Sequence, residues 1–188
     1  ENSDGRRAIQ TVLHECLTKL VKLIAPILPH TADEVWSFID NAGAVSVQLT
    51  DMPEQENFAN STDVKAKWDQ FMIVRDEVLK ALEEARNAKV IGKSLNAKVS
   101  MFVNEETKEL LEGIEESLEQ LFIVSAVEIA GSIYDAPEEA VKLEHAAILV
   151  TKADGETCER CWNISEEVGT VEKHPTLCKR CSTVVDEE

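Results

Sequence analysis

The sequence of 188 residues has no long apolar run and few cysteines or aromatic side chains. No stretch approaches the eighteen or more apolar residues that a membrane-spanning helix needs, and no charged segment followed by an apolar one resembles a secretion leader. These absences favour a cytoplasmic protein with no membrane partner. The chain begins at Glu1 rather than Met and enters a helical pattern almost at once, so we expect a piece of a longer protein.

Basic side chains are also scarce, because 19 Lys and Arg face 36 Asp and Glu, giving a net charge of −17. Indiscriminate binding to nucleic acid is driven by neutralisation of phosphates, so this charge argues against it. The acid is uneven. Residues 99–157 carry fourteen acidic and three basic side chains, whereas residues 63–98 carry six acidic and eight basic ones. Any polyanionic partner must therefore be met locally.

Residue sets typical of an active site are missing as well. The sequence has no Ser/His/Asp set, no glycine-rich phosphate loop and no acidic pair with an obvious pocket. We therefore predict no catalytic residue in this chain.

Helical periodicity dominates the first half of the sequence. Apolar residues recur every three or four positions over 7–28, which predicts a long core helix with Cys16 on its buried face. A second helix is expected to begin at Thr31, whose hydroxyl and the carboxylate of Glu34 would form a capping box. A third helix is predicted over 63–89.

The fold class that follows is mainly α with a small α+β unit. Residues 1–91 are expected to form a helical bundle, and the period changes from 3.6 to 2 near Gly92. Residues 92–153 then read as an α+β junction domain, in which Asn104 caps an acidic helix that breaks at Gly113. Its short strands are predicted at 95–103, 123–129 and 146–152.

Residues 154–188 hold two CxxC pairs, sixteen residues apart: Cys158, Cys161, Cys178 and Cys181. This spacing predicts one four-cysteine zinc site, because each CxxC turns tightly and presents two thiolates from one side. A closed set of four sulfurs makes the ion structural, and it would order a tail with few apolar side chains. Two disulfides are the competing interpretation, which a cytoplasmic location disfavours.

Three cations in the zinc segment allow two interpretations. Arg160, Lys179 and Arg180 could offset the formal charge of −2 that four thiolates leave on one Zn²⁺. They could instead face outward with Trp162 and form a surface for phosphates and bases. Both interpretations can hold together.

Three stretches resemble a known family. "LIAPILPHTADEVW" (23–36) resembles the anticodon-binding helical domain of the class I aminoacyl-tRNA synthetases for isoleucine, valine and leucine. "VIGKSLNAKV" (90–99) resembles the junction that follows it in isoleucyl enzymes, and "CERCWNISEEVGTVEKHPTLCKRC" (158–181) resembles the terminal zinc finger of bacterial isoleucyl-tRNA synthetases. The chain is thereby identified as similar to the carboxy-terminal part of such an enzyme.

The resemblance implies an ATP-dependent ligase that joins isoleucine to its tRNA. ATP and isoleucine would bind in a catalytic domain that this chain lacks, and the chain, as part of a monomer, would pack against the rest of the enzyme. Its partner would be the anticodon region of isoleucine tRNA, met by phosphate and base contacts. The residues expected to make those contacts are Arg75, Arg86, Lys89, Lys93, Lys98, Arg160, Trp162, Lys179 and Arg180.

Two rival functions remain open from the residues. The zinc finger also resembles the terminal finger of formamidopyrimidine-type DNA glycosylases, although Trp162 follows Cys161 where those fingers usually have glycine, and the helical run 23–36 has no place there. The acidic charge would also suit a zinc ribbon that binds protein.

Overall fold

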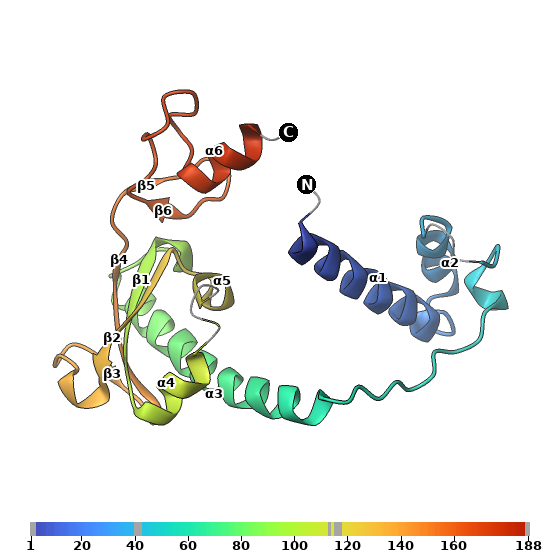
Figure 1. The fold of residues 1–188 in the computed structure, drawn as a ribbon, viewed down its shortest axis with the longest axis horizontal. Helices are drawn as coiled ribbons and strands as arrows, with labels where there is room; N and C mark the ends of the chain where they lie inside the picture. Colours follow the sequence, from blue (N-terminus) through green and yellow to red (C-terminus); the bar gives the residue numbers. More distant parts are fainter. Residues whose placement is uncertain (1–2, 40–42, 113, 115–117, 187–188) are drawn as a thin grey trace. The chain divides into compact units, whose positions relative to one another are not determined.

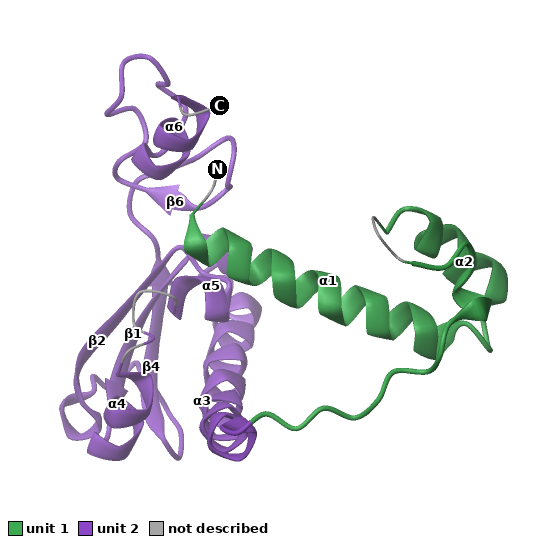
Figure 2. Cartoon of the chain, turned by 45° about the vertical axis from the view of Figure 1, so that its right-hand side comes forward, with its two compact units in different colours: residues 1–58 green, residues 59–188 purple. Residues whose placement is uncertain are grey.

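A computed structural model describes residues 3–39, 43–112, 114 and 118–186. The chain forms two compact units, residues 1–58 and residues 59–188 (Figure 2). Within the described residues, no helix combines the length and the apolar character that crossing a bilayer requires.

The first unit consists of helix α1 (Asp4–Ile24), helix α2 (Pro29–Ser37) and the 3₁₀ helix η1 (Val47–Leu49) (Figure 1). Trp36 is the centre of its small core, and its indole Nε1 donates a hydrogen bond of 2.9 Å to the carbonyl of Ala44. Lys22 lies over the same ring, 5.7 Å from the centroid. The other buried side chains are Val21, Ala25, Ala32 and Val47.

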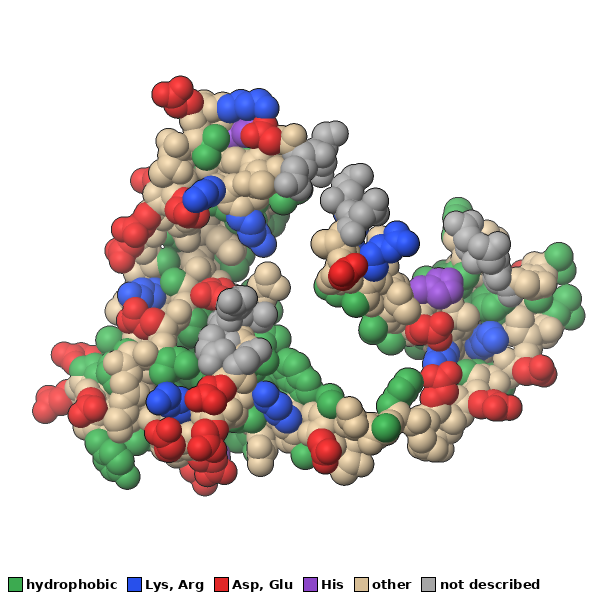
Figure 3. Space-filling view, in the orientation of Figure 1, with side chains coloured by type: hydrophobic (Ala, Val, Ile, Leu, Met, Phe, Trp, Pro, Cys, Tyr) green, Lys and Arg blue, Asp and Glu red, His purple; other side chains and the backbone are tan. Residues whose placement is uncertain are grey.

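Most of the apolar stripe of α1 is exposed. Ile9, Val12, Leu13 and Leu20 each expose more than half of their surface, and Val21 is the one buried residue of this helix. Cys16 is exposed too, so its predicted core position is wrong. The periodicity shows which face favours burial, but no described residue of the 1–58 unit covers that face. The hydrophobic side chains of α1 are visible as green in Figure 3.

The predicted capping box at the start of α2 is also wrong. The helix begins two residues earlier, at Pro29, and Leu28 occupies the N-cap without a side-chain hydrogen bond. Proline suits this position because its fixed φ matches the helix and its missing N–H is not needed there. Thr31 therefore lies inside the first turn and cannot serve as the cap.

The second unit contains one long helix, a four-stranded sheet and a small terminal module (Figure 1). Helix α3 spans Ser61–Asn87, close to its predicted range. In chain order the other elements are η2 (Ser94–Asn96), β1 (Ala97–Val103), α4 (Glu105–Leu111), α5 (Leu118–Phe122), β2 (Ala126–Ser132), η4 (Ile133–Asp135), β3 (Val141–Lys142), β4 (Ala146–Lys152), β5 (Glu156–Thr157), β6 (Ile164–Ser165) and α6 (Lys179–Asp186).

The sheet has the strand order β2-β1-β4-β3, with β1 parallel to β2 and antiparallel to β4. Val99 of β1 lies opposite Val127 and Val150, and the sheet packs against α3. Phe71 of α3 stacks on Phe122 of α5, with ring centroids 5.8 Å apart, in the core that α3 and the sheet share. The mainly α class with a small α+β unit is thereby confirmed.

The partner of α3 differs from the expectation of a helical bundle over 1–91. Its buried residues Phe71, Val78 and Leu82 join the core that contains Val99 and Met101 of β1. The boundary between the two compact units falls between residues 58 and 59, so α3 belongs to the same unit as the sheet. The division of this chain into three domains, with boundaries after residues 91 and 153, stays a prediction.

The structure confirms one local signal of the α+β region and corrects another. Asn104 does cap α4, since its side chain accepts a 2.8 Å hydrogen bond from the N–H of Thr107. The predicted strand at 123–129 begins only at Ala126, because Ile123 adopts a left-handed φ of +59° that ends α5. The expected break at Gly113 lies outside the described residues.

Candidate metal centre and nucleic-acid interface

The zinc module begins at a turn that requires glycine. Gly155 has a φ of +107°, and a Cβ at this position would lie 2.3 Å from the backbone carbon of Ser165. Only glycine permits both the dihedral angle and this close approach. The turn lets β5 pair with β6, with Thr157 opposite Ile164, and so places Cys158 directly after a strand.

The four cysteines meet in one cluster, although twenty-four residues of chain include them. All four Sγ atoms lie within 4.8 Å of one another, and those of Cys161 and Cys178 are 3.9 Å apart. A tetrahedral zinc site with Zn–S bonds of about 2.3 Å places its sulfurs about 3.8 Å apart. Cys158, Cys178 and Cys181 are buried, so the cluster has the spacing and enclosure of one structural zinc ion.

Two local structures present these sulfurs. In the first pair, the N–H of Trp162 donates to the carbonyl of Cys158 at 2.8 Å and closes the turn. In the second pair, Cys178 precedes α6, Cys181 lies in the first turn of that helix, and the N–H of Ser182 donates to the carbonyl of Cys178. The amide of Cys178 also donates to the sulfur of Cys158 at 3.3 Å, which links the two pairs.

Thiolate formation is uneven across the cluster. Burial opposes ionisation of Cys158, but backbone N–H groups of Cys161, Cys178 and Arg160 lower its pKa to about 6. Burial raises the pKa of Cys178 to about 12, and the neighbouring thiols add to this rise. A zinc ion that binds here near neutral pH must therefore displace protons, as thiolate ligands require.

Two of the three predicted cations turn toward the sulfurs. The guanidinium Nη1 of Arg160 lies 4.0 Å from the sulfur of Cys181. The thiol of Cys161 accepts a hydrogen bond from Arg180 and raises the pKa of its guanidinium. These contacts favour charge compensation as one role of both arginines. Lys179, the first residue of α6, is exposed.

Trp162 is presented to solvent by its backbone. Its φ of +66° is left-handed, and 69% of its surface is exposed although it directly follows a buried metal-ligand turn. An exposed indole held beside a rigid turn offers a flat face on which a base can stack.

Ser125 joins the zinc module to the sheet. Its Oγ donates a 2.6 Å hydrogen bond to the carbonyl of Leu95 and accepts one of 2.7 Å from the N–H of Ile164 in β6. Its own N–H donates to the carbonyl of Ala97. One side chain thus couples β6 to the segment before β1.

The predicted basic residues outside the zinc module divide into two groups. Arg75 and Lys98 are occupied within the fold: Arg75 Nε donates to the carbonyl of Leu121 at 2.9 Å, and Lys98 forms a 2.8 Å ion pair with Glu128. Neither is well placed to be a free phosphate contact. Lys93 is exposed and stays a predicted contact.

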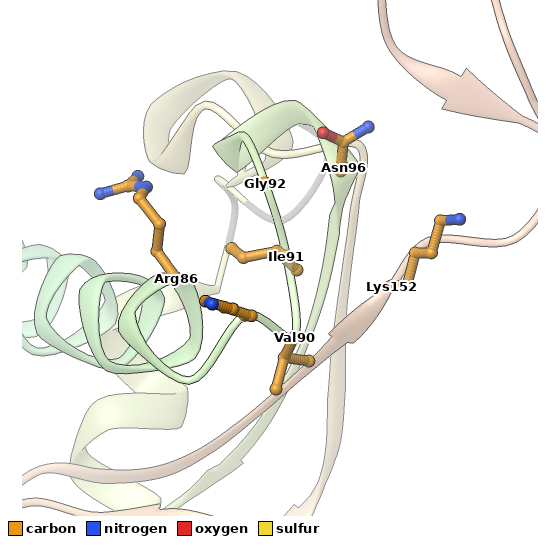
Figure 4. Close-up of a pocket in the computed structure, with 7 residues that line it drawn as sticks. Arg86, Val90, Ile91, Gly92, Asn96 and Lys152 are labelled. Atoms are coloured by element: carbon orange, nitrogen blue, oxygen red, sulfur yellow. The ribbon is translucent and has the colours of Figure 1, made fainter.

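Arg86 and Lys89 line a shared hollow of about 570 Å³ at the end of α3. Lys152, at the end of β4, lies on the opposite side of this hollow from Arg86 (Figure 4). Arg86 pairs with Glu83 and donates to Ser94 at 3.0 Å, whereas Lys89 and Lys152 form no ion pair with any residue that the structure describes.

Sequence reasoning missed Lys152, Ser125 and the residues beside the zinc module. Lys152 is the last residue of a strand in the most acidic region, so charge counting did not single it out. No local pattern marks Ser125, because its role depends on β6, about forty residues away. On the face in Figure 3, Lys and Arg side chains form separate small patches with Asp and Glu between them.

Metal-binding side chains gather at one place in the part of the chain that is described. There, the four cysteines are the one group of three or more His, Cys, Asp or Glu side chains placed to share a metal ion. His174, the other metal-binding side chain of the loop, instead approaches Asp186 at 3.1 Å. The four cysteines thus suit one structural metal ion.

Two family models match the chain. Residues 1–101 match the anticodon-binding domain of tRNA ligase, and residues 155–184 match the zinc finger found in FPG and IleRS. The second match covers all four clustered cysteines.

The relatives agree with the first match. The chain is 58% identical over 186 residues, 99% of its length, to an isoleucine–tRNA ligase of Bacillus cytotoxicus. It is 58% identical over 97% of its length to that of Bacillus mycoides and 56% identical over 99% to that of Bacillus cereus. In each case the chain spans about 20% of the length of the curated relative.

These matches decide between the rival families. The finger model alone fits both DNA glycosylases of the FPG type and isoleucyl enzymes, but a match over residues 1–101 points to tRNA ligases only. The relatives extend the likeness across the α+β region, so neither the glycosylase nor a protein-binding ribbon is favoured. With the anticodon-binding model matching 1–101 of 188 residues, the chain belongs to the family of tRNA-ligase anticodon-binding domains.

Proposed function

We propose that this chain is the tRNA-recognition region of an isoleucine–tRNA ligase and binds the anticodon region of isoleucine tRNA. The observation that carries the proposal is the exposed Trp162, which directly follows the turn from Cys158 to Cys161 in a finger of the IleRS type. Likeness to isoleucine–tRNA ligases over nearly the whole chain supports the same assignment.

Zinc would have a structural role here. Bound by Cys158, Cys161, Cys178 and Cys181, it would fix the two cysteine turns relative to each other. Once the two turns are fixed, Trp162 offers a stacking face to an unpaired base, and Lys179 is free of the sulfurs to meet phosphate. Arg160 and Arg180 balance the thiolates and add positive potential at the same surface.

The exposed cations at the end of α3 would supply a second contact. Lys89, Lys93 and Arg86 lie in or near the hollow that Lys152 completes. Contacts of this kind position a backbone without reading its sequence. Two small basic areas suit a chain of net charge −17, since the acid elsewhere repels RNA from other surfaces.

The activity of the whole protein follows from the family. We infer that it joins isoleucine to its tRNA with ATP, in the cytoplasm and as a monomer, using a catalytic domain outside this chain. The exposed stripe of α1, with Ile9, Val12 and Leu13, would pack against the remainder of the ligase. Burying such a face would offset the cost of its present exposure.

Trp162→Ala in the full-length ligase tests the proposal. The variant should lose about 1 to 3 kcal/mol of tRNA binding, seen as a higher KM for tRNA in charging, with isoleucine activation by ATP unchanged. Tyr134→Ala is the matched control, because Tyr134 is a 93% exposed aromatic residue at η4, outside both basic areas. Equal charging by the two variants would contradict the stacking role.

Binding specificity gives the complementary test. Isoleucine tRNA, an unrelated tRNA and duplex DNA should be titrated with the zinc-loaded protein at moderate salt. A clear preference for isoleucine tRNA is expected. A preference for duplex DNA would support a glycosylase-like role instead. No detectable binding to any of the three nucleic acids would support a protein-binding ribbon.

A further inference from the structure

A second hollow, of about 490 Å³, lies beside the zinc module and has no role so far. Its walls come from three parts of the 59–188 unit: the end of α5, the segment before β2, and the turn that carries Cys161. The side chains that matter below are Glu119, Gln120, Ile123, Asn163 and Arg180. It is large enough to admit one nucleotide base.

The polar groups around this hollow suit a neutral ring better than an anion. Glu119 offers a carboxylate that accepts hydrogen bonds and would repel phosphate. Gln120 and Asn163 each carry an amide that both donates and accepts, as base edges do. Arg180 adds a donor whose charge is already shared with the thiol of Cys161.

Ile123 supplies an apolar wall at a conformational cost. It is β-branched, yet its φ is +59°, and 53% of its surface is exposed. Left-handed backbone is rare for such residues, and glycine or asparagine is the usual choice at the end of a helix. Because this side chain is exposed, burial does not explain why isoleucine occupies the position. Strained residues that persist without a packing role often serve a binding site.

Trp162 is the immediate neighbour, along the chain, of two residues that line the hollow. Cys161 and Asn163 both line the hollow, and Trp162 stands between them with 69% of its surface exposed. A nucleotide strand that stacks one base on Trp162 would have its neighbouring nucleotides close to residues that line this hollow.

We propose that the hollow between α5 and the zinc module receives one unpaired RNA base, with Ile123 as its apolar wall and Gln120 and Asn163 as its edge-reading groups. The proposal rests on the proposed function and extends it, because it adds three contacts that are neither cationic nor aromatic. Base readout by amides at this position would contribute specificity, whereas the cations contribute affinity.

Ile123→Gly separates binding from folding, because the two should change in opposite directions. Removing the strained side chain should leave the melting temperature equal to or above that of the unaltered protein, while the Kd for isoleucine tRNA rises about fivefold or more. Ile73→Ala is the matched control: it truncates an isoleucine of similar exposure, 50% against 53%, on α3, and should leave the Kd unchanged.

Gln120→Ala provides a second probe that does not touch the backbone, since this exposed side chain makes no hydrogen bond with the described residues. It should also raise the Kd for isoleucine tRNA, and by less for an unrelated tRNA. All assays use the zinc-loaded full-length protein. If Trp162→Ala weakens binding but Ile123→Gly and Gln120→Ala do not, the base pocket is overturned and the proposed function stands. If the unaltered protein shows no preference for isoleucine tRNA, the proposed function itself fails.

Discussion

The α3–sheet region and the zinc module belong to one compact unit but are held together by different forces. The first buries sixteen residues in a common core, including Phe71, Phe122 and Met101, and so rests on apolar burial. The second buries three cysteines, packed with Val168 and Leu177, and little else. A short segment without a core needs a metal to fold, so the two regions should respond to different perturbations.

Removal of zinc should give the largest effect and should separate the two regions. Cys178→Ser breaks the tetrahedron, and a structural zinc site contributes on the order of 10 kcal/mol to the segment that it orders. We expect bound zinc to fall from one ion per chain to nearly none, with loss of amide protection over 155–186 and retention over 97–152. Elemental analysis and hydrogen exchange measure these outcomes.

Cys16→Ser is the control for that experiment, because Cys16 is exposed and lies outside the cluster. It should leave both the zinc content and the exchange pattern unchanged. If the sheet lost protection together with the module in Cys178→Ser, the two regions would be one cooperative structure and the contrast between them would be wrong.

Phe122→Ala is the converse perturbation. The ring is fully buried and stacks on Phe71, so its removal should cost about 3 to 5 kcal/mol of unfolding free energy through lost burial and a cavity. Urea denaturation followed by circular dichroism measures the loss. Phe38→Ala, at an 81% exposed phenylalanine, should cost little. An equally small loss for both variants would show that the core depends less on this pair than its burial indicates.

Ser125→Ala tests how far the two regions are coupled. The variant leaves the buried N–H of Ile164 without its acceptor, which should cost about 1 to 3 kcal/mol and speed exchange of that amide. Zinc content should not change, because no ligand is touched. Ser132→Ala, at the other end of β2, is the control. Unaltered exchange at Ile164 would mean that the module docks by other contacts.

Protonation of His145 should have the smallest effect on the α3–sheet region. The carboxylate of Glu77 accepts a 2.8 Å hydrogen bond from the ring of His145 and raises its pKa, with burial partly opposing the rise. This stabilisation is complete below the ordinary histidine pKa of about 6.5 and is lost as pH rises through the raised value.

Glu77→Gln should therefore cost about 0.5 to 1 kcal/mol at pH 5.5 and less at pH 9, since the pair is partly screened by solvent. Thermal unfolding at both pH values checks the difference. Glu138→Gln, which changes an exposed carboxylate outside this pair, should show no such pH dependence. A cost that grows with pH would contradict the pairing.

Sequence reasoning succeeded where the signal is local. The CxxC spacing predicted the cysteine cluster, Asn104 predicted the start of α4, and the alternation before Val103 predicted β1. Each of these depends on residues within a few positions of one another, where short-range geometry decides the outcome.

The same reasoning failed where a distant or absent partner decides. Periodicity placed Cys16 in a core, but it identifies a face and not what covers it. The sheet, rather than a bundle, receives α3 because strands far along the chain supply the complementary surface. The hollow beside the zinc module could not be predicted from the sequence, because Gln120 and Asn163 come to line it only after folding. The left-handed backbone of Ile123 could not be predicted either, since no sequence pattern marks it.

The turn between β4 and β5 cannot accommodate a side chain at Gly155. In a saturation library of this protein, selected for growth, every one of the nineteen replacements at this codon should be depleted, alanine as strongly as tryptophan. Its neighbours Asp154 and Glu156, both exposed, should accept most changes. A single intolerant column flanked by permissive ones would be the genetic signature of this turn.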